Sequence, residues 1–192
     1  VSYFGVEKYD SESTSLITAN RLDQHLRALK DSGYVTITQD DIIAYYNEGK
    51  PLPEKALFLL FEDGRKDSAI FAQSVLERYN YVATVLSYAD RINLPNTKFL
   101  SDSDLKLLRR STFWELGTNG YRLEYINVFD RYKNYFGRLS SYEAIEVMGY
   151  LVRDYNHYLM DFIRDADGIP TESLTDLKNR TAFDYMNMNN VY

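Results

Sequence analysis

The pattern of hydrophobic and polar positions predicts helices and strands in alternation along most of the chain. Leu22, Leu26 and Leu29 recur every three or four residues, which places them on one face of an amphipathic helix over Thr18–Ser32. The same spacing and capping residues predict further helices over Asp40–Tyr46, Ser68–Tyr79 and Ser101–Ser111. β-Branched or continuously apolar runs predict strands over Tyr34–Thr38, Ala56–Phe61, Tyr81–Ser87 and Trp114–Gly117. Strands that alternate with helices form parallel sheets with crossover helices, so the pattern predicts an α/β layer or barrel.

Beyond the fourth predicted strand the pattern changes to that of long helices. A capping-box pattern followed by apolar residues at helical spacing predicts a helix from Ser140 to about Arg164. A second helix is predicted over Thr171–Met188. Four strands are fewer than the about eight of a closed barrel. We therefore expect one domain over residues 1–192 with a partial or irregular (β/α) barrel, truncated on its C-terminal side, whose residues 140–192 form a helical segment.

Composition and charge narrow the classes of partner. A net charge of −6 argues against nucleic acid, because phosphate binding needs a basic surface. No apolar window approaches about 18 residues, so no membrane span is expected. The absence of cysteine excludes disulfides and Cys-ligated zinc, but it does not fix the compartment. The oligomeric state also stays open. The 18 tyrosines fit either an ordinary surface or a carbohydrate-binding one, since their rings stack on sugars and their hydroxyls form hydrogen bonds.

Two adjacent carboxylates end the most apolar predicted strand. The run Ala56–Phe61 leads directly into Glu62-Asp63-Gly64. One interpretation is structural, because Asp-Gly favours tight turns. The other is chemical, because α/β barrels keep their active sites at the carboxyl ends of their strands. The pattern by itself leaves both open.

The order of these elements resembles that of a known family. "LDQHLRALKDSGYVTITQDDIIAYYNEGKPLPEKALFLLFEDG" resembles the opening segment of the polysaccharide deacetylases (the NodB homology domain, carbohydrate esterase family four). "FAQSVLERYNYVATVLS" and "LSDSDLKLLRRSTFWELGTNG" resemble the segments that follow there, so the resemblance covers about residues 18–124. It implies an irregular (β/α) barrel. It also implies metal-assisted removal of acetyl groups from N- or O-acetylated sugars.

The resemblance assigns roles to individual residues. It places Glu62 as the general base and Asp63 as a metal ligand. Asn119 stands where the family has its first metal-ligating histidine, and Leu123 stands where it has the second. Shifting the second position by one residue offers Glu124. Asp63, Asn119 and Glu124 would form an all-oxygen set suited to Ca²⁺ or Mg²⁺. The alternatives are the family's zinc or a similar divalent metal, or no cofactor.

The same resemblance implies a groove at the carboxyl ends of the strands, with Arg65 and Tyr121 as substrate-binding residues. Arg65 is either a solvated charge or an ion-pair partner that replaces the metal at Asp63. The only histidines, His25 and His157, are expected to be structural or exposed. Because both metal-ligating histidines are replaced, whether the chain is an enzyme stays open.

Two functions are therefore expected from the resemblance. The first is a deacetylase-like domain, with an impaired or lost metal site, that acts on or binds acetylated polysaccharides or oligosaccharides. The second is a non-catalytic glycan-binding or scaffolding module, a pseudoenzyme within a larger carbohydrate-active protein. The family's substrates imply an extracellular or cell-envelope location. The sugar and the position of its acetyl group stay open.

Overall fold

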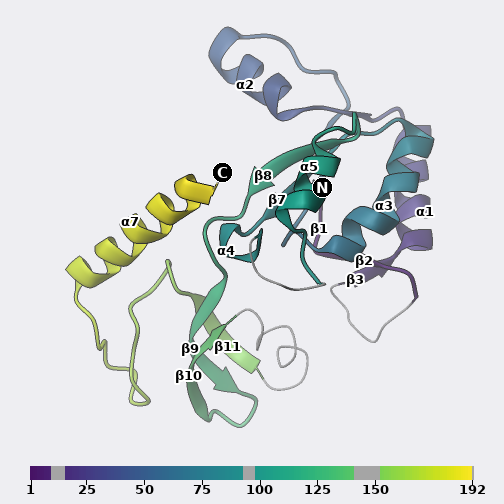
Figure 1. The fold of residues 1–192 in the computed structure, drawn as a ribbon. Coiled ribbons are helices and arrows are strands. Elements are labelled where there is room, and N and C mark those ends of the chain that lie inside the picture. Colours follow the sequence, from purple (N-terminus) through teal and green to yellow (C-terminus); the bar gives the residue numbers. More distant parts are fainter. Residues whose placement is uncertain (10–15, 93–97, 141–151, 192) are drawn as a thin grey trace. The chain divides into compact units, whose positions relative to one another are not determined.

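The computed structural model describes residues 1–9, 16–92, 98–140 and 152–191 (Figure 1). The chain divides into two compact units, Val1–Asn119 and Gly120–Tyr192. No helix among the described residues has the length and apolar character needed to cross a membrane.

The first unit is built on a parallel four-stranded sheet. Its strands, in order across the sheet, are β1 (Ser2–Tyr3), β6 (Leu60–Phe61), β7 (Ala83–Ser87) and β8 (Trp114–Thr118). Two further parallel pairs join β2 (Gly5–Glu7) to β3 (Leu16–Thr18) and β4 (Val35–Thr36) to β5 (Ala56–Leu57). The predicted α/β class with parallel strands is confirmed. The described strands do not join into one closed barrel.

The predicted continuous strand over Ala56–Phe61 divides in two. Its first half, β5, pairs with β4, whereas its second half, β6, pairs with β1 and β7. The division was not visible in the sequence, because an uninterrupted apolar run satisfies both pairings equally well. Strand β1 was not predicted either. It has only two residues, too few to carry a period.

The helices of the first unit confirm the predicted spacing. They are α1 (Ala19–Asp31), α2 (Gln39–Glu48), α3 (Lys66–Tyr79), α4 (Ala89–Ile92) and α5 (Asp102–Leu108). Capping boxes open two of them, Thr38 with Asp41 at α2 and Ser101 with Asp104 at α5. Figure 1 shows α1 and α3 side by side. The short helix α4, which directly follows β7, was not predicted.

The core of the first unit is formed by buried side chains of the four-stranded sheet and of helices such as α1 and α3. Phe61 of β6 is fully buried and packs edge-on against Trp114 of β8, with ring centroids 5.3 Å apart. Leu22 and Leu26 of α1 are also fully buried, as their helical spacing predicts. This packing fixes the sheet whose carboxyl edge carries the candidate site.

Among its described residues, the second unit contains a three-stranded antiparallel sheet and one long helix. The strands, in order across the sheet, are β10 (Tyr135–Ser140), β9 (Glu124–Asp130) and β11 (Val152–His157), and the helix is α7 (Leu174–Val191). Helix α7 confirms the helix predicted over Thr171–Met188. Ser173 caps it by accepting from the Asp176 amide, while the Asp176 carboxylate accepts from the Ser173 amide.

The helix predicted from Ser140 to about Arg164 is wrong where it can be compared. Residues 152–157 form β11, which pairs antiparallel with β9 along its length. Tyr155 of β11 packs against Tyr125 of β9, with ring centroids 4.6 Å apart. Strand pairing of this kind is set by partners distant in sequence and overrides the local helical spacing. The first part of the predicted helix, residues 141–151, lies outside the described residues.

Candidate active site

Glu62 and Asp63 lie at the carboxyl end of β6, where the sequence predicts them. Asp63 and Gly64 both have positive φ angles, 64° and 58°, so the chain turns sharply away from the sheet. A Cβ added to Gly64 would lie 2.6 Å from the Cβ of Ser87. Only glycine therefore lets this turn rest against the end of β7. The turn presents both carboxylates at the edge of the sheet.

Strand β1 holds the Glu62 side chain. The Ser2 hydroxyl donates a hydrogen bond to Glu62 Oε1, and the Glu62 amide donates to the Tyr3 carbonyl at 2.9 Å. The carboxylate predicted as general base is thus positioned by a strand that lies 60 residues earlier in the chain. Tyr3 also stacks on Phe61, which joins β1 to the buried core.

The Asp63 carboxyl group sits in an unfavourable place for a negative charge. Its pKa is raised from the ordinary 3.8 to about 6, mainly by burial and in the same direction by the neighbouring Glu62 carboxylate. The guanidinium groups of Arg65 and Arg91 act in the opposite direction and lower the pKa. A carboxyl group that titrates near neutral pH can exchange a proton during a reaction.

Arg65 has a different ion-pair partner from the one considered in the sequence. Its guanidinium donates to both oxygens of the Asp67 carboxylate, at 3.2 and 2.7 Å. The side chain also packs over Gly5, where an added Cβ would meet Arg65 Nε at 2.9 Å. The structure therefore pairs Arg65 with Asp67 rather than with Asp63. Its role in substrate binding stays a prediction.

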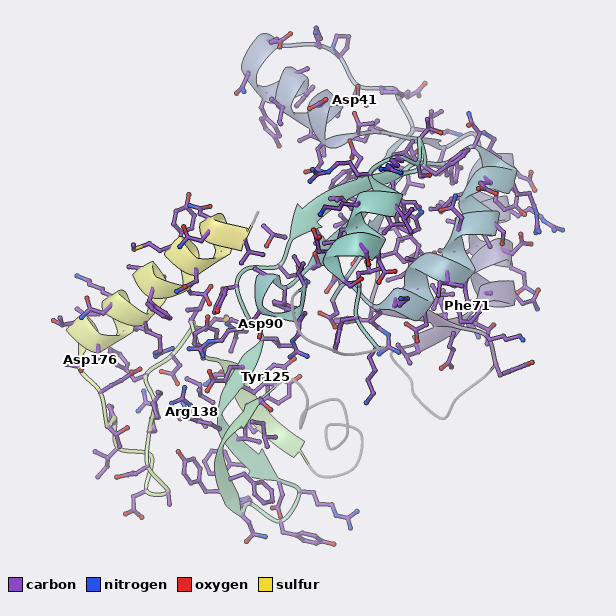
Figure 2. The ribbon with its side chains drawn as sticks, viewed as in Figure 1. Asp41, Phe71, Asp90, Tyr125, Arg138 and Asp176 are labelled. Atoms are coloured by element: carbon purple, nitrogen blue, oxygen red, sulfur yellow. The ribbon has the colours of Figure 1, made fainter. Side chains whose placement is uncertain are left out.

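Arg91 is a charged residue of this edge that sequence reasoning missed. It lies on α4, directly after β7, and is only 3% exposed. Its Nε lies 3.3 Å from Asp90 Oδ1, and its guanidinium lies 4.6 Å from the centre of the Phe99 ring. Figure 2 labels Asp90 on α4. The sequence feature that could have indicated Arg91 is the pair of adjacent charges, Asp90-Arg91, which follows soon after the end of a predicted buried strand.

Asn119 extends the same edge beyond β8. The backbone N–H of Asn119 donates to the Ser87 carbonyl at 3.0 Å, so the parallel pairing of β7 and β8 continues one residue past the strand. The turn at Asp63 and Gly64 also rests on Ser87. The structure therefore brings Glu62, Asp63 and Asn119 to the carboxyl edge of one sheet.

Two other predicted residues belong to the second unit. The Tyr121 amide donates to Asp184 Oδ2 at 3.3 Å, which ties the start of the unit to α7. Glu124 forms ion pairs with Arg138 at 2.5 Å and Arg122 at 3.7 Å. Figure 2 labels Arg138 and Tyr125 on this small sheet. Glu124 is thus engaged by two arginines, and its role as a metal ligand finds no support.

The two histidines have structural surroundings. His25 is exposed on α1 and its ring stacks on Tyr3, which agrees with the prediction. His157 was predicted on a helix but lies on β11, where its Nδ1 accepts from the Leu159 amide at 3.2 Å. Burial is the main cause of the lowered pKa of His157. Its imidazole is therefore predominantly neutral at neutral pH.

The residues at this edge fit a divalent metal poorly. Within the described ranges, no group of three or more His, Cys, Asp or Glu side chains is placed to hold one. Glu62, Asp63 and Asn119 supply oxygen ligands, which suit Ca²⁺ or Mg²⁺ rather than zinc. The guanidinium groups of Arg65 and Arg91 act electrostatically on Asp63, and their positive charge opposes the approach of a metal cation.

Comparisons with known proteins give the fold. No protein family profile matches the chain, and no curated protein matches it by sequence. Among solved structures, the chain is similar over its whole length to a de-N-acetylase from Aggregatibacter actinomycetemcomitans, with a TM-score of 0.69 and 20% identity, covering 72% of that chain. It is similar over 96% of its length to the BpsB deacetylase domain from Bordetella bronchiseptica, with a TM-score of 0.64 and 17% identity, again covering 72% of that chain.

A further similarity covers part of the chain. A polysaccharide deacetylase from Bacillus cereus matches 62% of this chain and 38% of its own, with a TM-score of 0.51 and 20% identity. The order of parallel strands and helices in the first unit, with two carboxylates at the carboxyl edge, agrees with the resemblance stated from the sequence. The chain thus has the fold of the polysaccharide deacetylases.

Proposed function

We propose that this chain is a polysaccharide-deacetylase-like domain that acts on or binds N- or O-acetylated glycans at the carboxyl edge of its parallel sheet. The observation that carries the proposal is the placement of Glu62 and Asp63. Two adjacent carboxylates end the central strand β6, and one of them has a pKa raised to about 6. Raised carboxyl pKa values at the end of a barrel strand are typical of acid–base chemistry.

Each carboxylate has a role in this proposal. Glu62, held by the Ser2 hydroxyl, accepts a proton from water or from a sugar hydroxyl. Asp63 is partly protonated near neutral pH and donates a hydrogen bond to the carbonyl oxygen of the acetyl group. Asn119 adds a neutral amide, which both donates and accepts, at the same edge. Arg65 and Tyr121 stay as predicted contacts to the sugar.

The alternative function is a glycan-binding or scaffolding module without hydrolysis. The presence of Asn119 and Leu123 at the two positions where the family has metal-ligating histidines supports this alternative over a zinc-dependent deacetylase. In both cases the partner is an acetylated polysaccharide or oligosaccharide. The corresponding location is extracellular or in the cell envelope.

Binding and hydrolysis are tested with one pair of ligands. An oligosaccharide of N-acetylglucosamine and the same oligosaccharide of glucosamine are titrated into the protein by calorimetry, and acetate release is followed in parallel. We expect saturable binding of the acetylated ligand only, weakened about tenfold or more by Glu62→Gln or Asp63→Asn. Glu77→Gln, a matched change on the exposed side of α3, should bind normally.

The outcomes separate the two functions. Acetate release that disappears in Glu62→Gln would identify a hydrolase. Binding without acetate release would identify the glycan-binding module. Equal binding of both oligosaccharides, or binding that neither site variant changes, would contradict the proposed site.

A further inference from the structure

The four-stranded sheet of the first unit has two different faces. Helices α3 and α5 connect β6 to β7 and β7 to β8, which are neighbours in the sheet. Because such connections between parallel strands are right-handed, both helices lie on the same face. The buried side chains of Phe61, Val85 and Trp114 belong to that face, and each is at most 5% exposed. The Trp114 indole also donates to the Gln73 side chain of α3, which identifies this face as the one that the helices cover.

The register of the strands shows which residues lie on the opposite face. Leu60 of β6 is paired with Thr84 of β7, and Thr84 is paired with Glu115 of β8. Paired residues point to the same side of a sheet, and side chains alternate along each strand. Glu62 lies on this side too, because Ser2, which is paired with Leu60, donates a hydrogen bond to its carboxylate. Glu62 and Glu115 therefore share one face of the sheet.

The surface between these two glutamates is apolar and partly exposed. A Cβ added to Gly117 would lie 2.6 Å from Leu86 Cδ2, so the Leu86 side chain lies across β8 at this glycine. Leu86, Glu62 and Glu115 are all of intermediate exposure, in contrast to the buried side chains of the other face. The face is therefore accessible at Glu62, at Glu115 and at the apolar residue between them.

The Glu115 carboxylate is held in place by one of its two oxygens. Its Oε2 accepts from the Gln39 backbone N–H at 2.9 Å and from the Thr84 hydroxyl at 3.1 Å. The Gln39 side chain also donates to the Leu116 carbonyl at 3.2 Å, which fixes the start of α2 to β8. Both hydrogen bonds that Glu115 forms among the described residues end on Oε2, so Oε1 is available to a ligand. An oriented carboxylate oxygen accepts strongly from a hydroxyl group.

We propose that Glu115 is a second glycan contact, whose Oε1 accepts a hydrogen bond from a hydroxyl group of a sugar residue farther along the oligosaccharide than the one at Glu62. Two strand spacings across the sheet and two residues along it separate the glutamates, which corresponds to about 12 Å between their Cα atoms. One sugar ring does not span this separation, whereas a short oligosaccharide does. The glycan thus crosses the face of the sheet as well as its edge. The inference rests on the proposed function for the class of ligand.

The contact is tested by the dependence of affinity on ligand length. A disaccharide and a tetrasaccharide of N-acetylglucosamine are titrated by calorimetry into the protein and into Glu115→Gln. The glutamine oxygen can still accept from Gln39 and Thr84, while its NH₂ group replaces the available oxygen. We expect the affinity for the tetrasaccharide to fall about fivefold or more, and that for the disaccharide to change by less than about twofold. Glu77→Gln, on the exposed side of α3, is the matched control and should change neither affinity.

A second measurement uses the unmodified protein, so it does not depend on the folding of a variant. The backbone N–H of Gln39 donates to the Glu115 carboxylate, so its amide resonance reports on a ligand at that carboxylate. The tetrasaccharide should shift this resonance and the disaccharide should not. The Gly49 amide, at the other end of α2, is the control and should not move. A bound tetrasaccharide that leaves the Gln39 resonance unchanged would overturn the proposal.

The outcomes also separate this proposal from the proposed function. If Glu115 only anchors α2, Glu115→Gln changes both affinities equally or changes neither, and either result overturns the second contact. Disaccharide binding that Glu62→Gln leaves unchanged would instead contradict the proposed site at Glu62. Disaccharide binding that depends on Glu62, with a tetrasaccharide affinity that does not depend on Glu115, would overturn the second contact alone.

Discussion

The hydroxyl of Ser2 donates a hydrogen bond to the carboxylate of Glu62. This contact joins the first strand of the sheet to the first acidic residue after its central strand, across 60 residues of sequence. It gives the candidate base a defined orientation. The orientation comes from a hydroxyl donor, which itself carries no charge in the physiological pH range.

Removing this hydroxyl should weaken the site without harming the fold. Ser2→Ala takes away one hydrogen bond to an exposed carboxylate, and we expect acetylated-glycan binding or hydrolysis to fall by about threefold to tenfold. Ser2→Thr keeps the hydroxyl and should retain most of the function. Calorimetry with the acetylated oligosaccharide measures both variants. Unchanged binding by Ser2→Ala would show that Glu62 needs no such support.

The raised pKa of Asp63 makes a prediction about stability and pH. The pKa is about 6 in the folded chain and near 3.8 when unfolded. At about pH 3 both states keep the proton and the difference contributes nothing. Above 3.8 the unfolded state loses its proton more readily, and the resulting destabilisation is complete once the pH exceeds about 6.

Asp63→Asn should therefore stabilise the protein at about pH 7.5 and have little effect at about pH 3.5. The difference between the two pKa values corresponds to at most about 3 kcal/mol. Urea denaturation of both proteins at the two pH values measures it. A variant that is destabilised at the higher pH would mean that the ionised Asp63 is stabilised by its arginine neighbours more than it is penalised by burial.

Gly64 should be far less tolerant than another glycine with a similar backbone. Gly64→Ala places a Cβ 2.6 Å from the Cβ of Ser87 at a φ of 58°, and we expect a loss of about 2–4 kcal/mol. Gly49, at the end of α2, has a φ of 70° with no atom within 4 Å of an added Cβ. Gly49→Ala should cost only about 1 kcal/mol. Equal losses for the two variants would show that Ser87 yields to the added methyl group.

Asp184 should anchor α7 to the start of the second unit. It is the buried residue of that helix among those described, and its Oδ2 accepts from the Tyr121 amide. Asp184→Ala should speed hydrogen exchange at Tyr121 by about tenfold, because the amide loses its acceptor. Asp176→Ala at the start of the same helix removes a capping contact instead and should leave the Tyr121 amide unchanged.

The sequence predicts much of the first unit because the signals there are local. Capping boxes at Thr38 and Ser101 and the leucine spacing of α1 depend only on neighbours along the chain. The failures concern partners distant in sequence. Strand β11 was read as helix because its pairing with β9 cannot be seen in its own residues.

The candidate site divides in the same way. Glu62 and Asp63 follow a recognisable apolar strand, and Asn119 follows another, so their common edge could be predicted. Arg91 could not, since its place depends on Phe99 meeting both its guanidinium and the backbone of Arg65. The Ser2 contact depends equally on a strand of only two residues.

Because the turn at Gly64 packs directly against Ser87, the size of the Ser87 side chain limits where the candidate site can lie. Ser87 is buried at the end of β7, so enlarging it to threonine or valine would push the turn outward. The Asp63 carboxylate would then move to a new position, although Asp63 itself is not substituted. Substitutions at Ser87 would thus change the position of the site carboxylates without replacing any of them.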